Sequence, residues 1–380
     1  MSLLLEFHLI QNFAPSNLNR DDTGAPKDAV FGGYRRARVS SQCFKRAIRM
    51  AVRDQGLIEP RFQGVRTKKL KDMLEQRLAV LGRTDAESKI IAALSAAGLK
   101  LGDDGKTEYL LFLGDAEIAG FAELIDKHWD ELATAAPSEG KKTKKEAKAS
   151  APADVVKKAK ALLDGGKAID VALFGRMLAD LPEVNRDAAC QVAHAISTHR
   201  VEREFDYFTA VDDEGGPDET GAGMIGQVEF NSATFYRYAV IDAHKLLENL
   251  QGDKELTLLA VEAFVQAAVR AIPTGKQNTF AAHNPPSFVG TVIRHGGPLN
   301  LANAFEKPIT AKQDKSLTTL SVEALTSYES RLATMYADSS DAWSYLDLTG
   351  SWPKAKGLAH ADIAGLAAWV KEQVVLQLEA

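Results

Sequence analysis

The sequence predicts an α+β fold in which a sheet is interrupted by a long helical insertion. Three patterns support this prediction: a first segment with strand alternation, a long middle stretch with helical periodicity, and two later segments rich in Val, Phe, Tyr and Thr. At 380 residues, the chain exceeds the roughly 250–300 residues at which a single core stops growing. We therefore expect two domains, or one domain with a large insertion.

The first elements are a strand and a capped helix. Apolar side chains alternate along residues 3–10, which predicts a strand with one face against the core. Residues 11–33 are polar and predict a long loop. Ser40 or Ser41 then provides an N-cap, and apolar residues at helical spacing predict a helix that ends near residue 54.

The middle of the chain has mostly helical spacing. Residues 67–136, 170–181 and 185–199 each predict helical structure. Residues 140–160 combine many lysines with Ala and Ser and almost no aromatic groups, which is a low-complexity composition. We expect this lysine-rich segment to be a solvated surface loop.

Strands and helices alternate in the last part of the chain. Residues 201–211 and 227–241 predict strands that flank an acidic, glycine-rich connection at 212–223. A helix at 255–272 then precedes a strand at 288–293. Without the insertion, this order is the split βαβ pattern of ferredoxin-like and RNA-recognition folds.

The element order also suggests domain boundaries. Residues 1–58 and 199–310 are expected to form the sheet domain, with residues 59–198 as its helical insertion. Residues 311–380 are expected to be a helical segment packed on the sheet domain, ending in an amphipathic helix at 361–378.

The composition limits the classes of protein that remain. The chain has 45% hydrophobic and 26% charged residues, as soluble globular chains do. Two cysteines, Cys43 and Cys190, argue against a disulfide framework and a multi-cysteine zinc module. No run approaches the ~18–20 apolar residues of a membrane span, and residues 1–10 do not resemble a signal peptide. We expect a cytoplasmic protein with no metal and no cofactor.

Charge is distributed very unevenly along the chain. The net charge of −5 by itself argues against a nucleic-acid partner. Between residues 20 and 71, however, fourteen basic side chains stand against five acidic ones, so this segment carries +9 and the rest of the chain −14. Charge separation on this scale indicates a polyanion site on an otherwise acidic protein.

The basic segment also contains groups suited to binding phosphate. Gly32 and Gly33 allow backbone N–H groups to approach an anion, and the two serines begin a helix whose free N–H groups favour negative charge. The polar stripe on that helix consists of Gln42, Lys45 and Arg49, with Arg46 alongside. The alternative is that acidic residues at 21, 22 and 28 neutralise these cations internally.

Several motifs resemble those of one known family. They are Leu18-Asn19-Arg20-Asp21-Asp22, Lys27-Asp28-Ala29-Val30-Phe31-Gly32-Gly33, Arg38-Val39-Ser40-Ser41-Gln42, Asp170-Val171-Ala172-Leu173-Phe174-Gly175-Arg176-Met177, Phe208-Thr209-Ala210-Val211-Asp212-Asp213 and Gly275-Lys276-Gln277. With these motifs the chain resembles the Cascade backbone subunit, the repeated guide-RNA-binding protein of type I-E CRISPR effector complexes. Residues 60–165 and the C-terminal helices resemble the family least.

The resemblance implies a fold, partners and site residues. The fold would be an RNA-recognition-like palm with helical fingers and a thumb at about residues 198–224. The partners would be the CRISPR RNA, other copies of the chain in a filament, other Cascade subunits and, through the guide, target DNA, with no membrane. The residues implied to hold the guide are Arg20, Lys27, Ser40, Gln42, Lys45 and Arg49. Met177 would wedge against a displaced base, and Tyr207 and Phe208 would lie near the base of the thumb.

Plainer interpretations remain for some of these residues. Met177 lies in an apolar stripe and could belong to the core. One of Tyr207 and Phe208 is expected to face inward, because adjacent strand side chains alternate between faces. Lys276 and Gln277 lie in a loop, where RNA contact and a structural role are equally open.

The search for catalytic residues gives one alternative function. His8 resembles the catalytic histidines of RNA-processing relatives, so an endoribonuclease that processes CRISPR repeat RNA is the runner-up. Strand alternation places His8 on the face away from the core, without an evident base partner. His194 and His199 lack the spacing of a helical metal pair, and paired acid–base groups typical of a metabolic enzyme are not evident. We expect a binding protein and not an enzyme.

Overall fold

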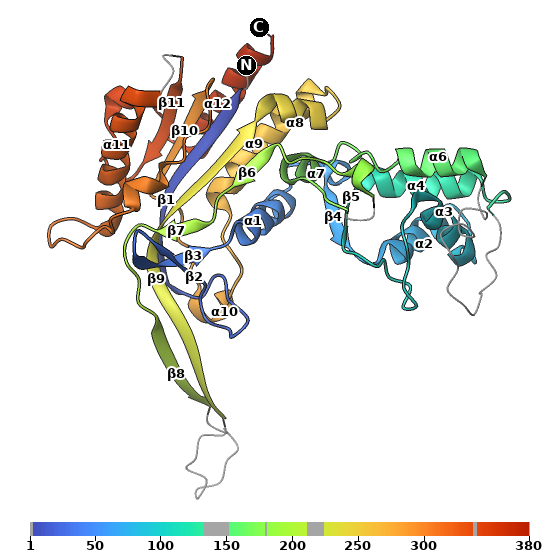
Figure 1. Cartoon of the computed structure of the whole chain (residues 1–380), viewed down its shortest axis with the longest axis horizontal. Helices are drawn as coiled ribbons and strands as arrows, with labels where there is room; N and C mark the ends of the chain where they lie inside the picture. Colours follow the sequence, from blue (N-terminus) through green and yellow to red (C-terminus); the bar gives the residue numbers. More distant parts are fainter. Residues whose placement is uncertain (1–2, 133–151, 179–180, 211–223, 337–339, 380) are drawn as a thin grey trace, which may run out of the picture. The chain divides into compact units, whose positions relative to one another are not determined.

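The chain divides into two compact units (Figure 1). The computed structural model describes residues 3–132, 152–178, 181–210, 224–336 and 340–379, so the acidic connection at 212–223 lies outside the described residues. The first unit comprises Met1–Gln55, Gln191–His244 and Val261–Ala380. The second unit comprises Gly56–Cys190 and Lys245–Ala260. The protein is a mixed α+β structure with one large sheet, as the sequence predicts.

The large sheet belongs to the first unit. Its strand order is β12, β11, β10, β1, β9, β7, β3 and β2. In that order the strands are Leu358–Ala359, Ala342–Asp347, Phe288–Arg294, Leu4–Ser16, Met224–Asp242, Ala195–Ser197, Tyr34–Val39 and Asp28–Phe31. β1 is antiparallel to both neighbours, with Leu5 opposite Ile241 of β9 and Ile293 of β10.

Strand β1 is buried on both faces, so the prediction of a single inward face is wrong. Every residue from 3 to 10 is buried. Phe7 packs on Phe264 of α9 (Lys254–Arg270), with ring centroids 5.2 Å apart. The opposite face lies in a core that includes residues of α11 (Leu317–Tyr336). Helices thus cover both faces of the sheet, which alternation in one strand cannot reveal.

The predicted loop at 11–33 is shorter than expected. β1 continues to Ser16, and β2 and β3 pair as a hairpin, which leaves residues 17–27 as a loop. Gly32 and Gly33 form the hairpin turn with φ values of +60° and +81°, the left-handed conformation that a two-residue turn requires. A Cβ on Gly32 would also overlap the carbonyl group of Glu306. These glycines therefore close a packed hairpin.

The predicted first helix is confirmed. Helix α1 spans Ser41–Asp54, and the Ser40 hydroxyl accepts a hydrogen bond from the backbone N–H of Cys43 at 3.3 Å. Phe44, Ala47 and Ile48 form its buried face. The predictions near α9, β10 and the last helix, α12 (Ile363–Glu379), are also confirmed to within a few residues.

The sequence predicted a helical C-terminal segment, and this prediction is wrong in part, because the segment also contains two strands. Between α11 and α12, β11 pairs antiparallel with β10, and β12 pairs parallel with β11. The short helices α8 (Ala243–Asn249) and α10 (Gln277–Phe280) flank α9 along the chain. Because β11 and β12 continue the sheet beyond β10, the backbone hydrogen-bonding groups of β10 are paired and not exposed at an edge.

A long hairpin extends from the sheet of the first unit (Figure 1). Among the described residues, strand β8, Glu204–Ala210, pairs with the first part of β9, from Ala210 opposite Met224 to Glu204 opposite Phe230. All seven residues of β8 are exposed. The expectation that one of Tyr207 and Phe208 faces a core is therefore wrong, because in the part of the chain that the structure describes both side chains are exposed on a two-stranded ribbon.

The second unit has its own helical core. In the described part of Gly56–Cys190, the α-helices are α2 (Leu70–Val80), α3 (Glu87–Ala97), α4 (Asp115–Lys127), α6 (Ala153–Ala161) and α7 (Ile169–Phe174). Strands β4 (Gly64–Thr67) and β5 (Leu111–Gly114) form a small sheet. Buried Leu74, Ile90 and Phe121 belong to one continuous cluster. In Figure 1, α3, α4 and α6 lie side by side.

Three predictions for this stretch are wrong. The helix predicted at 170–181 ends at Phe174, because Gly175 has φ +75° and a Cβ there would lie 2.8 Å from the Arg186 carbonyl oxygen. The helix predicted at 185–199 is replaced by β6 (Cys190–Val192) and β7. Residues 153–161, predicted as part of a lysine-rich loop, form α6, whose Val155 and Ala159 are buried.

Candidate nucleic-acid interface

The loop at 17–27 is a compact unit of the basic segment. Arg20 forms an isolated antiparallel bridge with Pro26, and the backbone N–H of Lys27 donates to the Asn19 carbonyl at 2.8 Å. Inside the loop, a carboxylate oxygen of Asp21 accepts from the hydroxyl of Thr23 at 2.7 Å. The loop is therefore held by its own hydrogen bonds, with the exposed Arg20 on its surface.

A cavity of about 380 Å³ lies between this loop, α1 and the segment before α10. It is lined by Leu18, Asn19, Arg20, Asp21, Cys43, Arg46, Ala47, Pro273, Thr274 and Gly275. Three segments that are distant in sequence therefore meet at one basic depression. A Cβ on Gly275 would overlap the carbonyl group of Leu18, so this glycine permits the loops to approach each other.

Helix α1 presents its polar face as the sequence predicts. Gln42 and Arg46 are exposed, while Lys45 and Arg49 are partly buried. Ser40 is buried, and its hydroxyl is engaged as the helix cap. The helix thus offers side-chain amide and cationic groups, whereas Ser40 fixes where the helix begins.

Electrostatics place two cations beside the cavity thiol. Burial raises the pKa of the Cys43 thiol, and the positive charges of Arg46 and Lys27 act in the opposite direction. For His194, whose charged form is the protonated one, burial lowers the pKa, and the charges of Arg38 and Lys27 lower it further. The Nδ1 atom of His194 lies 3.1 Å from the Arg38 guanidinium. The charge of Lys27 therefore acts on groups from two segments of the first unit, Cys43 on α1 and His194.

Internal neutralisation accounts for only part of the basic segment. Asp28 pairs with Arg35 at 2.6 Å and with Arg203 at 3.1 Å. Arg36 is fully buried and donates to the Phe305 carbonyl at 2.7 Å, so it is structural. Within the part of the chain that the structure describes, Arg20, Lys27 and Arg46 form no ion pair.

The two loop candidates after the cavity differ in their surroundings. Lys276 is partly exposed, directly follows Gly275 and has φ +50°, a conformation that a non-glycine residue rarely adopts. Gln277 is the first residue of α10 and not a loop residue as predicted, and its side chain donates to the Pro273 carbonyl at 2.9 Å, which fixes the preceding loop. Lys276 is therefore placed beside the cavity, and Gln277 shapes its wall.

Met177 lies in the second unit, directly after a buried and hydrogen-bonded arginine. Its side chain is 82% exposed, so the interpretation as a core residue is wrong. The preceding Arg176 is buried and pairs with Glu117 at 2.8 Å, and it also donates to the carbonyl groups of Leu163 and Val184. An exposed methionine thus follows an arginine that is held at several points.

The hairpin carries exposed apolar residues that the sequence reasoning missed. Phe205, Met224 and Ile225 are exposed by 59%, 58% and 63%, beside Tyr207 at 65% and Phe208 at 37%. A large apolar surface without a core behind it is typical of an interaction site. The signal in the sequence was the presence of apolar residues on both faces of a strand next to polar, glycine-rich sequence.

The histidine of the alternative enzyme function is inaccessible. His8 is fully buried, contrary to the expected outward face. Its Nδ1 atom lies 2.9 Å from the Tyr236 hydroxyl, and its Nε2 atom lies 3.5 Å from a Glu6 carboxylate oxygen. A carboxylate neighbour therefore exists that the sequence did not reveal, but substrate has no access to the ring.

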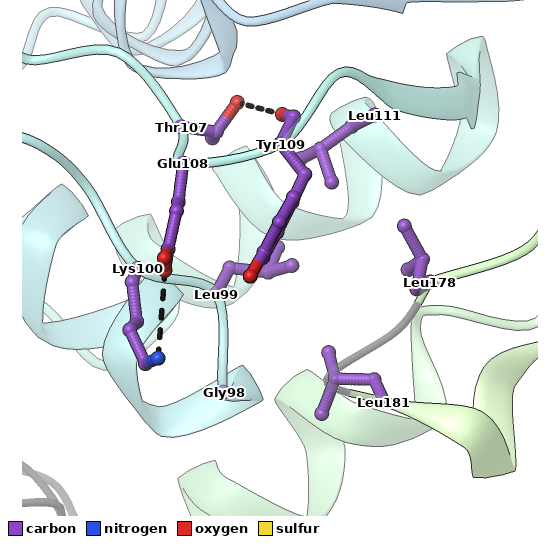
Figure 2. A pocket seen from close by; sticks show the side chains of 9 residues that line it. All are labelled: Gly98, Leu99, Lys100, Thr107, Glu108, Tyr109, Leu111, Leu178 and Leu181. Carbon is purple, nitrogen blue, oxygen red and sulfur yellow. Dashed lines mark hydrogen bonds and ion pairs between the residues drawn. The ribbon is translucent and has the colours of Figure 1, made fainter.

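Other possible sites carry less weight. The pocket in Figure 2 has a volume of only about 20 Å³. This is space for about one water molecule. Its polar groups bind one another, since Lys100 pairs with Glu108 and the Thr107 hydroxyl donates to the Tyr109 carbonyl. Among the described residues, no group of three or more His, Cys, Asp or Glu side chains could hold a metal ion. In the same residues, we find no helix with the length and apolarity of a membrane span.

Comparison with solved structures identifies the class of protein. A chain described as "CRISPR RNA-guided surveillance complex, pre-nicking" is similar with a TM-score of 0.82 and 30% sequence identity, over 98% of this chain and 100% of that one. A second, described as "CRISPR RNA-guided surveillance complex", has a TM-score of 0.72 and 26% identity, over 97% of this chain and 99% of that one. The fold is thus that of a Cascade-type CRISPR protein, as the sequence motifs predict.

Family comparison gives the more specific assignment. The model of the family described as "CT1975-like protein" matches residues 5–371. The chain belongs to the CT1975-like protein family. The search of curated proteins gives no match.

Proposed function

We propose that the protein is a non-catalytic backbone subunit of a type I-E Cascade complex. Copies of the chain polymerise along a CRISPR RNA guide and hold it for recognition of foreign double-stranded DNA. The observation that carries the proposal is the basic cavity, where Arg20 and Arg46 from separate segments meet. The similarity to chains of CRISPR RNA-guided surveillance complexes supports the same assignment.

The sheet of the first unit supports its assignment as the palm. Strands β10, β1, β9 and β7 are consecutive in the sheet and antiparallel. Numbered by chain order among these four, they stand in the order 4-1-3-2, with α1 after the first and α9 after the third. A split βαβ fold requires this arrangement. The second unit is then the fingers, and the β8–β9 hairpin is the thumb.

The charges of the palm suit an RNA backbone. Arg20, Lys27 and Arg46 attract phosphates, and Lys45, Arg49 and Lys276 extend the positive field on either side of the cavity. Gln42 offers an amide to a sugar or phosphate oxygen. Contacts of this kind fix the register of a strand without reading its sequence. Guide bases are thereby left available for pairing with a target strand.

The exposed apolar residues act on the guide and on neighbouring copies. Met177 wedges against a displaced base, a role that its exposed side chain and its position directly after the buried Arg176–Glu117 pair support. Tyr207 and Phe208 provide rings that stack on a base or pack against another copy. The hairpin exposes apolar area in the monomer that assembly would cover. Other Cascade subunits are further partners.

The burial of His8 argues against the endoribonuclease alternative. A general base must come within hydrogen-bond reach of the hydroxyl it deprotonates. The ring of His8 is instead enclosed by Glu6, Tyr236 and Trp343. A scaffold should therefore protect RNA rather than cut it.

One experiment tests both parts of the proposal. The purified protein is mixed with labelled CRISPR RNA at low salt, and both binding and the length of the recovered RNA are measured. We expect binding with full-length RNA recovered. The double variant Arg20→Gln/Arg46→Gln should lose most of the affinity, whereas Arg53→Gln/Arg270→Gln, which removes two exposed charges outside the cavity lining, should keep it. Equal binding by both variants contradicts the proposed site, and cut RNA contradicts the scaffold function.

A further inference from the structure

The sheet end of the β8–β9 hairpin, here called its root, comprises Arg203, Glu229 and Phe230. It contacts the chain at both ends of the 17–27 loop. At the start of the loop, the fully buried Asn17 donates from Nδ2 to the carbonyl groups of Gly24, at 3.0 Å, and Glu229, at 2.9 Å. After the loop ends, Asp28 pairs with Arg203, which precedes β8. Arg20 and Lys27 lie between these two points.

Arg203 bridges the loop side and the hairpin side. One terminal nitrogen lies 3.1 Å from Asp28, and the other lies 3.0 Å from Glu229 on β9. The three side chains are only 26–28% exposed, so solvent screens these pairs less than surface pairs. The planar guanidinium can hold two carboxylates at a fixed separation, which a lysine ammonium cannot do.

A third carboxylate also responds to Arg203. The hydrogen bond from the Thr23 hydroxyl holds the pKa of Asp21 below its ordinary value, and the charge of Arg203 acts in the same direction. The ring of Phe230, on β9, packs on Phe280 of α10, with centroids 5.6 Å apart. The hairpin root therefore contacts both the 17–27 loop and helix α10, which follows the cavity-lining residues 273–275 in the chain.

We propose that Arg203 is a positioning residue that couples guide binding at the 17–27 loop to the orientation of the β8–β9 hairpin. This inference rests on the proposed function, because it takes the guide to bind at Arg20 and Lys27. RNA bound at these side chains restrains the loop, and the Asp28–Arg203–Glu229 bridge transmits that restraint to the hairpin root. A copy that holds RNA then presents its hairpin in a defined direction.

Hydrogen exchange on a single copy tests the coupling. The probe is an RNA oligonucleotide short enough that native mass spectrometry finds one protein copy bound, so that a neighbouring copy cannot cover the hairpin. In the wild-type protein, RNA should slow hydrogen exchange at the backbone amides of Phe205 and Glu229 by about fivefold or more. Fivefold is the lower end of the range that is typical of allosteric coupling. In Arg203→Gln the same RNA should change that exchange by less than about twofold.

Three variants make the result specific. Arg200→Gln is the matched control, because Arg200 is an exposed arginine paired with Glu202 and outside the bridge; it should behave as wild type. Arg203→Lys keeps the positive charge but not the planar guanidinium that can hold two carboxylates. Protection of the hairpin root by RNA should therefore lie between that of wild type and that of Arg203→Gln. Asp28→Asn removes the other end of the bridge and should reproduce the loss if Arg203→Gln proves too unstable to measure.

The possible outcomes separate the inference from the function beneath it. If Arg203→Gln binds RNA and keeps the wild-type protection of the hairpin root, the coupling role is overturned and the RNA scaffold stands. The same holds if wild-type protein binds RNA without protecting the root. If wild-type protein does not bind RNA at low salt, the proposed function fails, and the inference fails with it.

Discussion

The Nε atom of Arg294 on β10 donates to a carboxylate oxygen of Glu6 on β1 at 2.8 Å, and both side chains are almost completely buried. The other oxygen of Glu6 accepts from the Tyr238 hydroxyl at 2.9 Å and the Leu299 backbone N–H at 2.5 Å. Because truncation leaves these donors without their acceptor, Glu6→Ala should reduce the free energy of unfolding by about 3–5 kcal/mol. Urea unfolding measures the loss. The control Glu323→Gln, at an exposed pair with Lys315, should leave the urea midpoint unchanged.

The same carboxylate should make stability depend on pH. Burial alone would raise the pKa of Glu6, but His8, Arg294 and the Leu299 N–H outweigh it, so the pKa lies below its ordinary value of 4.5. A lowered pKa stabilises the fold above the ordinary value, and this contribution is lost as pH falls through the folded value. The stability gap between wild type and Glu6→Gln should therefore be full near neutral pH and narrow below about pH 4.5. A gap that widens on acidification contradicts the assignment.

The salt dependence of RNA binding should report the contact made by Arg46. Each phosphate neutralised on single-stranded RNA contributes about 0.7 to the slope of log affinity against log salt concentration. Arg46→Gln should therefore lower the slope by roughly that amount. Arg53→Gln lies on the same helix outside the cavity and should leave the slope unchanged. Equal slopes for both variants would remove Arg46 from the interface.

Gly275 should be sensitive to the smallest possible side chain. A Cβ there would overlap the Leu18 carbonyl, so Gly275→Ala has to push the cavity walls apart. We expect a loss of about 1–3 kcal/mol in the free energy of unfolding, together with weaker RNA binding. Gly296→Ala is the matched control, because a Cβ at Gly296 meets no atom within 4 Å. Thermal unfolding and RNA titration of the two variants give the comparison.

Met177 should affect the guide without affecting the fold. Since its side chain is 82% exposed, Met177→Ala should change the free energy of unfolding by less than about 0.5 kcal/mol. Chemical probing of the assembled guide should show that the periodically reactive bases of the wild-type complex become less reactive. Arg176→Ala, which breaks the buried pair with Glu117, should instead lower stability by about 3–5 kcal/mol. An unchanged reactivity pattern in Met177→Ala would contradict the wedge role.

Local sequence patterns predicted the elements that depend on local physics. The apolar stripe and serine cap gave α1 almost to its observed ends, because a helix is set by neighbours three and four residues apart. The ring of His8 is enclosed instead by Tyr236 and Trp343, which lie more than two hundred residues later and which no local pattern contains. The strand β11 was missed for a similar reason, since its pairing with β10 is a tertiary contact.

The candidate site was predicted in chemistry but not in geometry. Charge counting found the basic segment, yet it could not separate Arg36, which is buried and structural, from Arg46, which lines the cavity. It also could not bring Gly275 to the 17–27 loop. The role of Asp28 as a shared partner of Arg35 and Arg203 required the fold, because Arg203 lies far along the chain.

The first strand has a consequence for synthesis of the protein on the ribosome. β1 is synthesised long before its partners at Ala233–Asp242 and Phe288–Arg294, which follow more than two hundred residues later. At about 5–20 residues per second, a wait on the order of tens of seconds separates the strand from its neighbours. The elements of the second unit from β4 to α4, residues 64–127, are synthesised during that interval. A buried strand that is synthesised long before both of its partners stays unpaired during that interval, and its delayed pairing makes closure of the sheet the slow step of folding.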